Sequence, residues 1–187
     1  MNLASRILNA FGWKVSVTVP DCPKCIICVA PHTSNWDFLW GKLAYASVGR
    51  TAGFLMKESW FFWPLKYFFR AMGGVPVPRR RGSSLSDILV ERFRTEPRLC
   101  LAITPEGTRS RTSRWRTGFL RIAFDAGVPI MLGAIDYARK LILIEDEFIP
   151  TGNIEEDMRA IKRFYRPFSG KYPEKFSTAE EEEEEAE

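Results

Sequence analysis

The chain has few of the side chains that build metal centres or disulfide frameworks. Its 187 residues include one histidine and four cysteines. Cys22, Cys25 and Cys28 have the spacing of part of an iron–sulfur motif, but Cys25 and Cys28 fall in an apolar run and no nearby fourth cysteine followed by proline completes the motif. We therefore predict free thiols in a reducing compartment, with no metal or other cofactor.

Long apolar stretches are also missing. No segment approaches the 18 uncharged apolar residues that a membrane-spanning helix needs. The N-terminus does not have the basic-then-apolar layout of a signal peptide. These two absences predict a cytoplasmic protein without a transmembrane anchor.

Two short segments nevertheless have the character of membrane-surface elements. Residues 1–14 predict an amphipathic helix whose apolar face holds Leu3, Ile7, Leu8 and Phe11. Residues 59–72 carry seven aromatic side chains in fourteen positions, interspersed with two cations, a mixture that favours the headgroup region of a bilayer. Packing in the protein core is an equally good interpretation of residues 59–72. If both segments bind lipid, the protein is peripheral on the cytoplasmic face of the membrane.

Charge is divided unevenly along the chain. Seven of its 23 acidic residues lie in residues 180–187, so residues 1–179 keep 16 acids against 27 bases, a net charge of +11 instead of +4. We predict an acidic, disordered tail over residues 171–187. The basic remainder suits nucleic acid, anionic lipid or a phosphorylated small molecule as a partner.

Strand-like and helix-like patterns alternate through residues 15–170. Strands are predicted at 24–30, 51–57, 74–79, 98–104, 128–135 and 140–149. Helices are predicted at 35–48, 83–95, 116–126 and 153–165, with the aromatic segment as a further helical stretch. This alternation predicts a single α/β domain with a mixed, largely parallel β-sheet covered by helices. The prolines of the 74–79 strand place it at a sheet edge.

The single histidine lies just beyond the first predicted strand, in the sequence VAPHTSNWDF at residues 29–38. Ser34 and Asp37 have the S-x-x-D spacing of a capping box, which by itself accounts for Asp37 but leaves His32 unexplained. In the functional interpretation the capped turn brings the carboxylate to one imidazole nitrogen. The other nitrogen is then available as a general base.

A second polar stretch, TPEGTRSR at residues 104–111, follows the 98–104 strand. Backbone N–H groups exposed by a glycine turn, together with Arg109, are typical of phosphate binding. Glu106 is suited to orienting an arginine or binding a substrate hydroxyl. An ordinary polar surface turn is the alternative.

A third stretch, GGVPVPRRR at residues 73–81, presents Arg79 at the end of a short strand. It opens a window, residues 79–121, that holds eleven arginines and no lysine. Arginine suits fixed, bidentate contacts with anions. A solvated basic face accounts for several of these residues.

Taken together, these stretches resemble the glycerolipid acyltransferases, the enzymes that acylate glycerol 3-phosphate and lysophosphatidate. The resemblance covers about residues 24–136. The matching segments are His32 to Asp37 for the family's H-x-x-x-x-D motif, Gly74 to Arg79 for its glycine-to-arginine motif, Pro105 to Arg109 for its P-E-G-T-R motif, and Val128 to Ile130 for its apolar V-P-I strand.

The resemblance implies a glycerol-3-phosphate acyltransferase-like fold and an O-acyltransferase of phospholipid biosynthesis. Such an enzyme moves a fatty acyl group from acyl-CoA or acyl carrier protein to a lysophospholipid-type acceptor, lysophosphatidate above all. His32 is then the base, oriented by Asp37. The acceptor is bound by Arg79, Glu106, Gly107, Thr108 and Arg109.

Other functions remain open at this stage. The acceptor is alternatively another lipid, such as an N-acylated amino-acid lipid, and a thioesterase would use the same catalytic residues. A nucleic-acid-binding domain would interleave aromatic and basic residues for base stacking. The arginine-rich window has few aromatic residues, so we predict no nucleic-acid partner.

Overall fold

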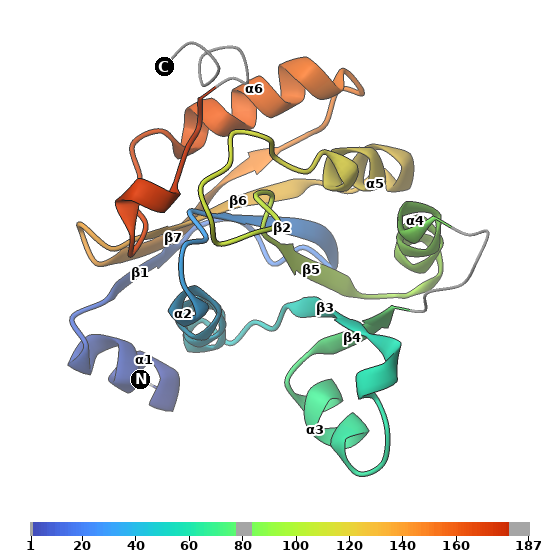
Figure 1. Ribbon diagram of the computed structural model, residues 1–187. Coiled ribbons are helices and arrows are strands. Elements are labelled where there is room, and N and C mark those ends of the chain that lie inside the picture. Colours follow the sequence, from blue (N-terminus) through green and yellow to red (C-terminus); the bar gives the residue numbers. More distant parts are fainter. Residues whose placement is uncertain (1, 78–83, 180–187) are drawn as a thin grey trace.

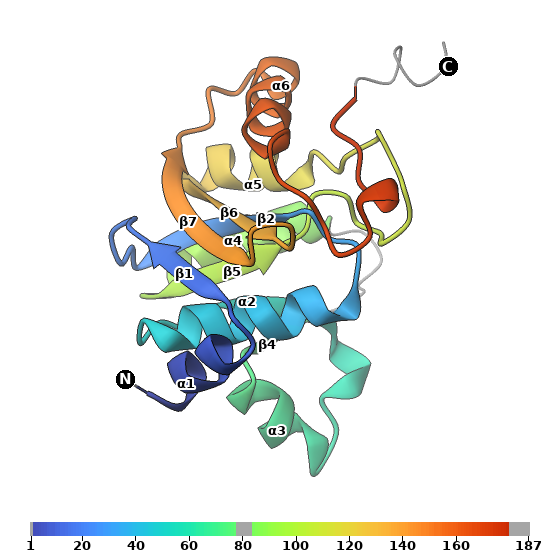
Figure 2. The ribbon, with the colours of Figure 1, turned by 90° about the vertical axis from the view of Figure 1, so that its left-hand side faces the viewer.

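A seven-stranded sheet with helices on both faces organises the chain (Figures 1 and 2). The structure is a computed structural model that describes residues 2–77 and 84–179. The strands, in chain order, are β1 Lys14–Val17, β2 Lys24–Ala30, β3 Gly53–Lys57, β4 Gly74–Val77, β5 Leu99–Ile103, β6 Ile130–Asp136 and β7 Leu141–Phe148. The helices are α1 Leu3–Ala10, α2 Asn35–Ser47, α3 Leu65–Ala71, α4 Leu85–Thr95, α5 Gly118–Ala126 and α6 Ile154–Tyr165.

The strands are ordered β1-β7-β6-β2-β5-β3-β4 across the sheet. All neighbouring pairs among the described strands are parallel except β6 and β7. The predicted mixed, largely parallel sheet is therefore confirmed, and so is the edge position of the strand that begins at Gly74. Strand β1 has no local sequence signal: it is four residues long and pairs with β7, where Lys14 lies opposite Leu141, 127 positions further along.

One face of the sheet is covered by α4, α5 and α6 (Figure 2). Because side chains alternate along a strand, Ile26 and Cys28 of β2 enter this core, whereas Cys25 and Ile27 point to the opposite face. Leu101 of the neighbouring strand joins the first core and is completely buried. The four cysteines are free thiols, as predicted.

The other face is covered by α1 and α2, and its core is divided between two smaller clusters. In α1 the predicted apolar face is only partly used: Leu8 is buried, while Leu3 and Phe11 are largely exposed. The Phe11 ring nevertheless lies 5.3 Å from that of Trp40 in α2. This helix therefore packs on α2 and still presents apolar side chains to its surroundings.

The aromatic segment projects from the molecule as a lobe made of a short 3-10 turn, Glu58–Trp60, and α3 (Figures 1 and 2). Neither element contains a buried residue. Trp63 is 76% exposed, and Phe62, Tyr67 and Phe68 are also exposed. The core interpretation of residues 59–72 is therefore wrong, because the segment lies outside both cores.

The C-terminal boundary also differs from the expectation. Residues 171–179 were assigned to a disordered tail, but they pack on the domain and include a second 3-10 turn, Pro173–Lys175. Trp115 Nε1 donates to Ser177 O at 3.1 Å, and Lys162 Nζ donates to Ala179 O at 2.7 Å. The glutamates of 180–187 lie outside the described residues. Within the described chain, no helix is long and apolar enough to cross a bilayer.

Candidate active site

The loop between β2 and α2 positions the histidine. Parallel strand β2 ends at Ala30, and α2 begins three residues after His32. The Asp37 carboxylate accepts hydrogen bonds from the backbone N–H groups of Thr33 and Ser34, both at 2.8 Å, and Ser34 caps the helix. These bonds form the predicted capping box and fold the chain back on itself.

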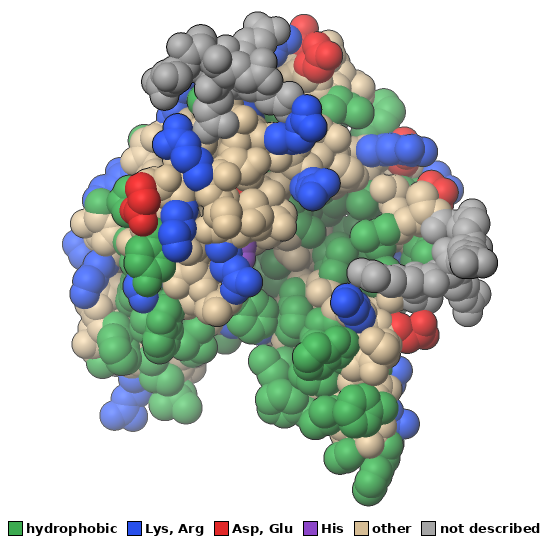
Figure 3. All heavy atoms as spheres, in the orientation of Figure 1, with side chains coloured by type: hydrophobic (Ala, Val, Ile, Leu, Met, Phe, Trp, Pro, Cys, Tyr) green, Lys and Arg blue, Asp and Glu red, His purple; other side chains and the backbone are tan. Residues whose placement is uncertain are grey.

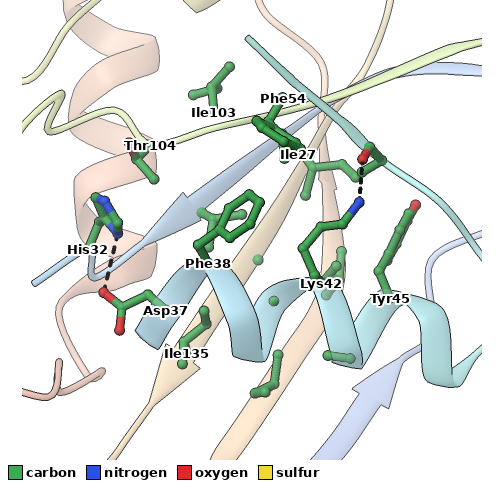
Figure 4. A pocket seen from close by; sticks show the side chains of 18 of the residues that line it. Ile27, His32, Asp37, Phe38, Lys42, Tyr45, Phe54, Ile103, Thr104 and Ile135 are labelled. Carbon is green, nitrogen blue, oxygen red and sulfur yellow. Dashed lines mark hydrogen bonds and ion pairs between the residues drawn. The ribbon is translucent and has the colours of Figure 1, made fainter. Parts of the chain in front are cut away.

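The same turn brings the imidazole to the carboxylate. His32 Nδ1 lies 3.2 Å from Asp37 Oδ2, as Figure 4 shows, and the His32 side chain is 20% exposed against 2% for Asp37. A buried carboxylate beside Nδ1 favours the tautomer that carries its proton there and leaves Nε2 free to accept one. One side chain therefore caps α2 and contacts the imidazole, so the capping interpretation is confirmed and the catalytic role of Asp37 stays a prediction.

Tyr137 is a third residue at this pair, and no sequence pattern predicted it. It follows β6 directly, and its hydroxyl donates to Asp37 Oδ1 at 2.7 Å. A polar residue just beyond a buried strand was the available signal, but nothing local connects it with a carboxylate 100 positions earlier.

Glu106 contacts the loop between β2 and α2. Its carboxylate is buried and accepts the His32 backbone N–H at both oxygens, at 3.0 and 3.1 Å. Burial raises the pKa of Glu106 to about 7. In the structure the Glu106 carboxylate therefore binds the backbone of His32. Its predicted contact with the acceptor stays a prediction.

Gly107 occupies a position that other residues would strain. Its φ is +64°, and an added Cβ would lie 3.0 Å from Cγ of Arg116. Arg116, whose backbone N–H donates to Pro105 O at 2.7 Å, is exposed and borders the same cavity as Gly107 and His32. In the sequence, Arg116 is only one of the eleven arginines of residues 79–121, with no local pattern that points to a role.

A cavity of about 790 Å³ extends from His32 along α2, between that helix and the sheet (Figure 4). Its volume lies within the range of small-molecule sites, roughly 300–1,000 Å³. Small residues line this space on both sides: Gly41, Ala44, Gly53, Ala102 and Gly133. Within the cavity Lys42 Nζ donates to the carbonyl oxygens of Ala52 and Met72, at 3.2 and 2.8 Å.

Arg109 lies outside this cavity, in a second hollow of about 440 Å³. Asn35 borders both spaces, so the hollow adjoins the catalytic loop. Lys175 and Tyr172 from the C-terminal segment line the hollow with Arg109, and Tyr172 N donates to Thr33 Oγ1 at 3.2 Å. Among residues 2–77 and 84–179, no ion pair engages Arg109 or Lys175, and the Lys175 ammonium lies over the Tyr172 ring at 4.5 Å from its centroid.

The remaining predicted residues have different outcomes. Thr108 Oγ1 accepts the Ser110 N–H at 3.2 Å, which shapes the turn that carries Arg109. Arg79 lies outside the described residues. Within the described chain, no group of three or more His, Cys, Asp or Glu residues is arranged to hold a metal ion.

Comparisons with known proteins agree with this architecture. A family model described as Acyltransferase matches residues 18–134, more than half of the chain. The chain therefore belongs to the Acyltransferase family, which confirms the resemblance drawn from its motifs, and it is an acyltransferase enzyme. No curated protein matches its sequence.

A solved structure shares the fold. It is the crystal structure of the 1-acyl-sn-glycerophosphate (LPA) acyltransferase PlsC from Thermotoga maritima, with a TM-score of 0.54 and 21% identity. The match covers 89% of this chain and 78% of the other. The predicted fold class is confirmed by this likeness together with the sheet order.

Proposed function

We propose that the protein is an O-acyltransferase that transfers a fatty acyl group from a thioester donor, acyl-CoA or acyl carrier protein, to the hydroxyl of lysophosphatidate or a similar lysophospholipid. The carrying observation is the His32–Asp37 pair, 3.2 Å apart, at one end of an elongated, mostly apolar cavity. Family membership and the likeness to an LPA acyltransferase support the same reaction. Formation of phosphatidic acid would place the enzyme in phospholipid biosynthesis.

The chemistry needs one base and no covalent acyl-enzyme. His32 Nε2 takes the proton of the acceptor hydroxyl as its oxygen attacks the thioester carbonyl, and Asp37 stabilises the imidazolium that forms. Collapse of the tetrahedral intermediate forms the new ester and breaks the carbon–sulfur bond. The thiolate leaves and takes the proton back from His32, so the enzyme returns to its starting state.

The acceptor phosphate has two cationic positions near the base. Arg109 and Lys175 border the second hollow, and Arg116 borders the cavity beside Gly107. Arginine forms bidentate contacts with phosphate. The turn at Thr108 holds Arg109 in a hollow that adjoins the loop of His32. We assign the phosphate to the Arg109 hollow, with Thr108 and Gly107 shaping the approach. The predicted role of Arg79 stays a prediction.

The acyl chain is assigned to the cavity along α2. The cavity is lined mainly by apolar side chains and extends away from His32 toward Tyr45 (Figure 4). A chain bound there would leave its thioester at the His32 end, where the acceptor hydroxyl arrives.

Lipid substrates are expected to enter from a membrane surface. Figure 3 shows hydrophobic side chains gathered on the two lower projections of the molecule, with many Lys and Arg side chains above them. The projections correspond to α1 with the neighbouring part of α2, and to the α3 lobe with its exposed Trp63. Aromatic side chains favour the headgroup region and cations favour anionic lipid. Peripheral binding at the cytoplasmic face, through these projections, is therefore part of the proposal.

An acceptor panel tests the proposed function. The purified protein receives palmitoyl-CoA with lysophosphatidate, lysophosphatidylcholine, a neutral monoacylglycerol, an N-acylated amino-acid lipid or no acceptor. Lipid mass spectrometry and free-thiol release are read together. We expect phosphatidic acid from lysophosphatidate, and a second arm with palmitoyl-acyl carrier protein identifies the donor.

Arg109→Ala sharpens the result, because it should raise the KM for lysophosphatidate at least tenfold and leave that for the donor unchanged. Arg163→Ala, an exposed arginine of α6, is the matched control. Thiol release that no acceptor stimulates would instead identify a thioesterase.

A further inference from the structure

Tyr137 is held at the catalytic pair by contacts on three sides. Its hydroxyl donates to Asp37 Oδ1 at 2.7 Å, and its ring packs edge-on against Trp13 with the centroids 5.0 Å apart. Its backbone N–H donates to the carbonyl oxygen of Ser169 at 2.9 Å. Strand β6 below and the C-terminal segment above therefore fix the position of the phenol.

The two oxygens of Asp37 have different partners. Oδ2 accepts the Thr33 and Ser34 N–H groups and faces His32 Nδ1, whereas the Tyr137 hydroxyl binds Oδ1. The backbone bonds already orient the carboxylate. The hydroxyl adds a donor that stabilises its negative charge, and a carboxylate whose charge is shared in this way attracts an adjacent imidazolium less strongly.

We propose that Tyr137 is a positioning residue for the base: by binding Asp37 Oδ1 it limits the hold of Asp37 on protonated His32 and keeps the imidazole ready to accept a proton. The inference rests on the proposed function for its catalytic consequence, but the interaction itself is independent of any activity. The phenol remains a donor across the working pH range, because burial and the Asp37 hydrogen bond raise its pKa.

Other charged or titratable groups also surround the pair and must be held constant. Glu106 binds the His32 backbone from the loop after β5, and Arg116 borders the cavity from the loop before α5. Tyr172, in the C-terminal segment, acts on Tyr137 electrostatically. A substitution at Tyr137 that removes only its hydroxyl leaves all three in place.

The single histidine makes this interaction directly measurable. Because the chain has no other imidazole, one set of imidazole NMR signals reports the pKa of His32 without assignment. In Tyr137→Phe we expect this pKa to rise by about half a pH unit, since Asp37 then holds the imidazolium more strongly. The acid limb of the kcat/KM profile should move up by the same amount, with KM values unchanged.

Two further variants control the result. Tyr67→Phe removes an exposed hydroxyl on α3 and should leave the titration unchanged. Site-specific 3-fluorotyrosine at position 137, a stronger donor of the same shape, should lower the His32 pKa and also covers the case in which Tyr137→Phe does not fold. An imidazole pKa that stays constant across the Tyr137 series, or falls in Tyr137→Phe, overturns the inference. If the NMR titration shifts as expected but the acid limb does not, the influence of Tyr137 on the Asp37–His32 contact is confirmed, whereas its catalytic consequence and His32 as the general base are both refuted.

Discussion

On the side of α4, α5 and α6, side chains from all three helices fill the space against β2, β5 and β6, whereas the side of α1 and α2 has two separate clusters and a cavity of about 790 Å³. Phe93, Leu120 and Tyr165 fill the first face, whereas Gly41 and Ala44 of α2 line the cavity on the second. The first face supplies most of the buried apolar contact. The second leaves an open space beside His32.

The largest effect should come from the base itself. His32→Ala, with folding confirmed by circular dichroism, should lower the rate of acyl transfer by about 10²- to 10⁴-fold, the usual contribution of a positioned general base. Its thermal midpoint should remain close to that of the wild type, because the imidazole belongs to the open face. A variant that keeps more than a tenth of the wild-type rate would refute the assignment.

The packed face should be the costlier one to disturb. Phe93→Ala, at a side chain 1% exposed, should lower the free energy of unfolding by about 3–5 kcal/mol. Phe38→Ala, at the cavity on the other face and 41% exposed, should cost about 1 kcal/mol or less. Urea denaturation measures both. Equal costs would mean that the two faces do not differ as described.

The free energy of unfolding should depend on pH through Glu106, whose buried carboxylate binds the His32 backbone. Its pKa is raised from 4.5 to about 7, so the folded protein binds the proton more tightly than the unfolded chain. Stability therefore falls as the pH rises from about 4.5 to 7, and Glu106→Gln removes this dependence. Relative to the wild type, the variant should gain about 3 kcal/mol of unfolding free energy between pH 4 and pH 8. Urea curves at both pH values test this, and parallel pH profiles would contradict it.

The smallest effect on stability should come from Gly41. A Cβ there would lie 3.7 Å from Ile135 Cδ1, an ordinary contact, so Gly41→Ala should stabilise α2 by about 0.5–1 kcal/mol. Gly41→Leu, in contrast, should fill the cavity and shift the preferred donor to shorter acyl chains. Relative kcat/KM values for C8 to C18 acyl-CoA measure the shift. An unchanged preference would place the acyl chain elsewhere.

Local sequence patterns predicted most of the elements and the core of the site. His32 and Asp37 are five residues apart, so the capped turn between them could be inferred from chain geometry alone. Other features depend on how the ends of separate strands meet. These are the contact of Glu106 with the His32 backbone, the hydrogen bond from Tyr137 to Asp37, and the placement of Arg109 and Arg116 in two different spaces. Likewise, β1 forms by pairing with β7, and the cavity is lined by residues of several elements that are distant in the sequence.

A single atom of Asp37 serves both the start of α2 and the contact with the imidazole, because Oδ2 accepts two backbone N–H groups and faces His32 Nδ1. Under the proposed mechanism, folding and catalysis consequently depend on the same side chain. Replacement by alanine would remove both contributions at once, whereas Asp37→Asn retains an acceptor oxygen for the turn while it removes the charge. Comparing the two variants therefore separates the contribution of Asp37 to the start of α2 from its contact with His32.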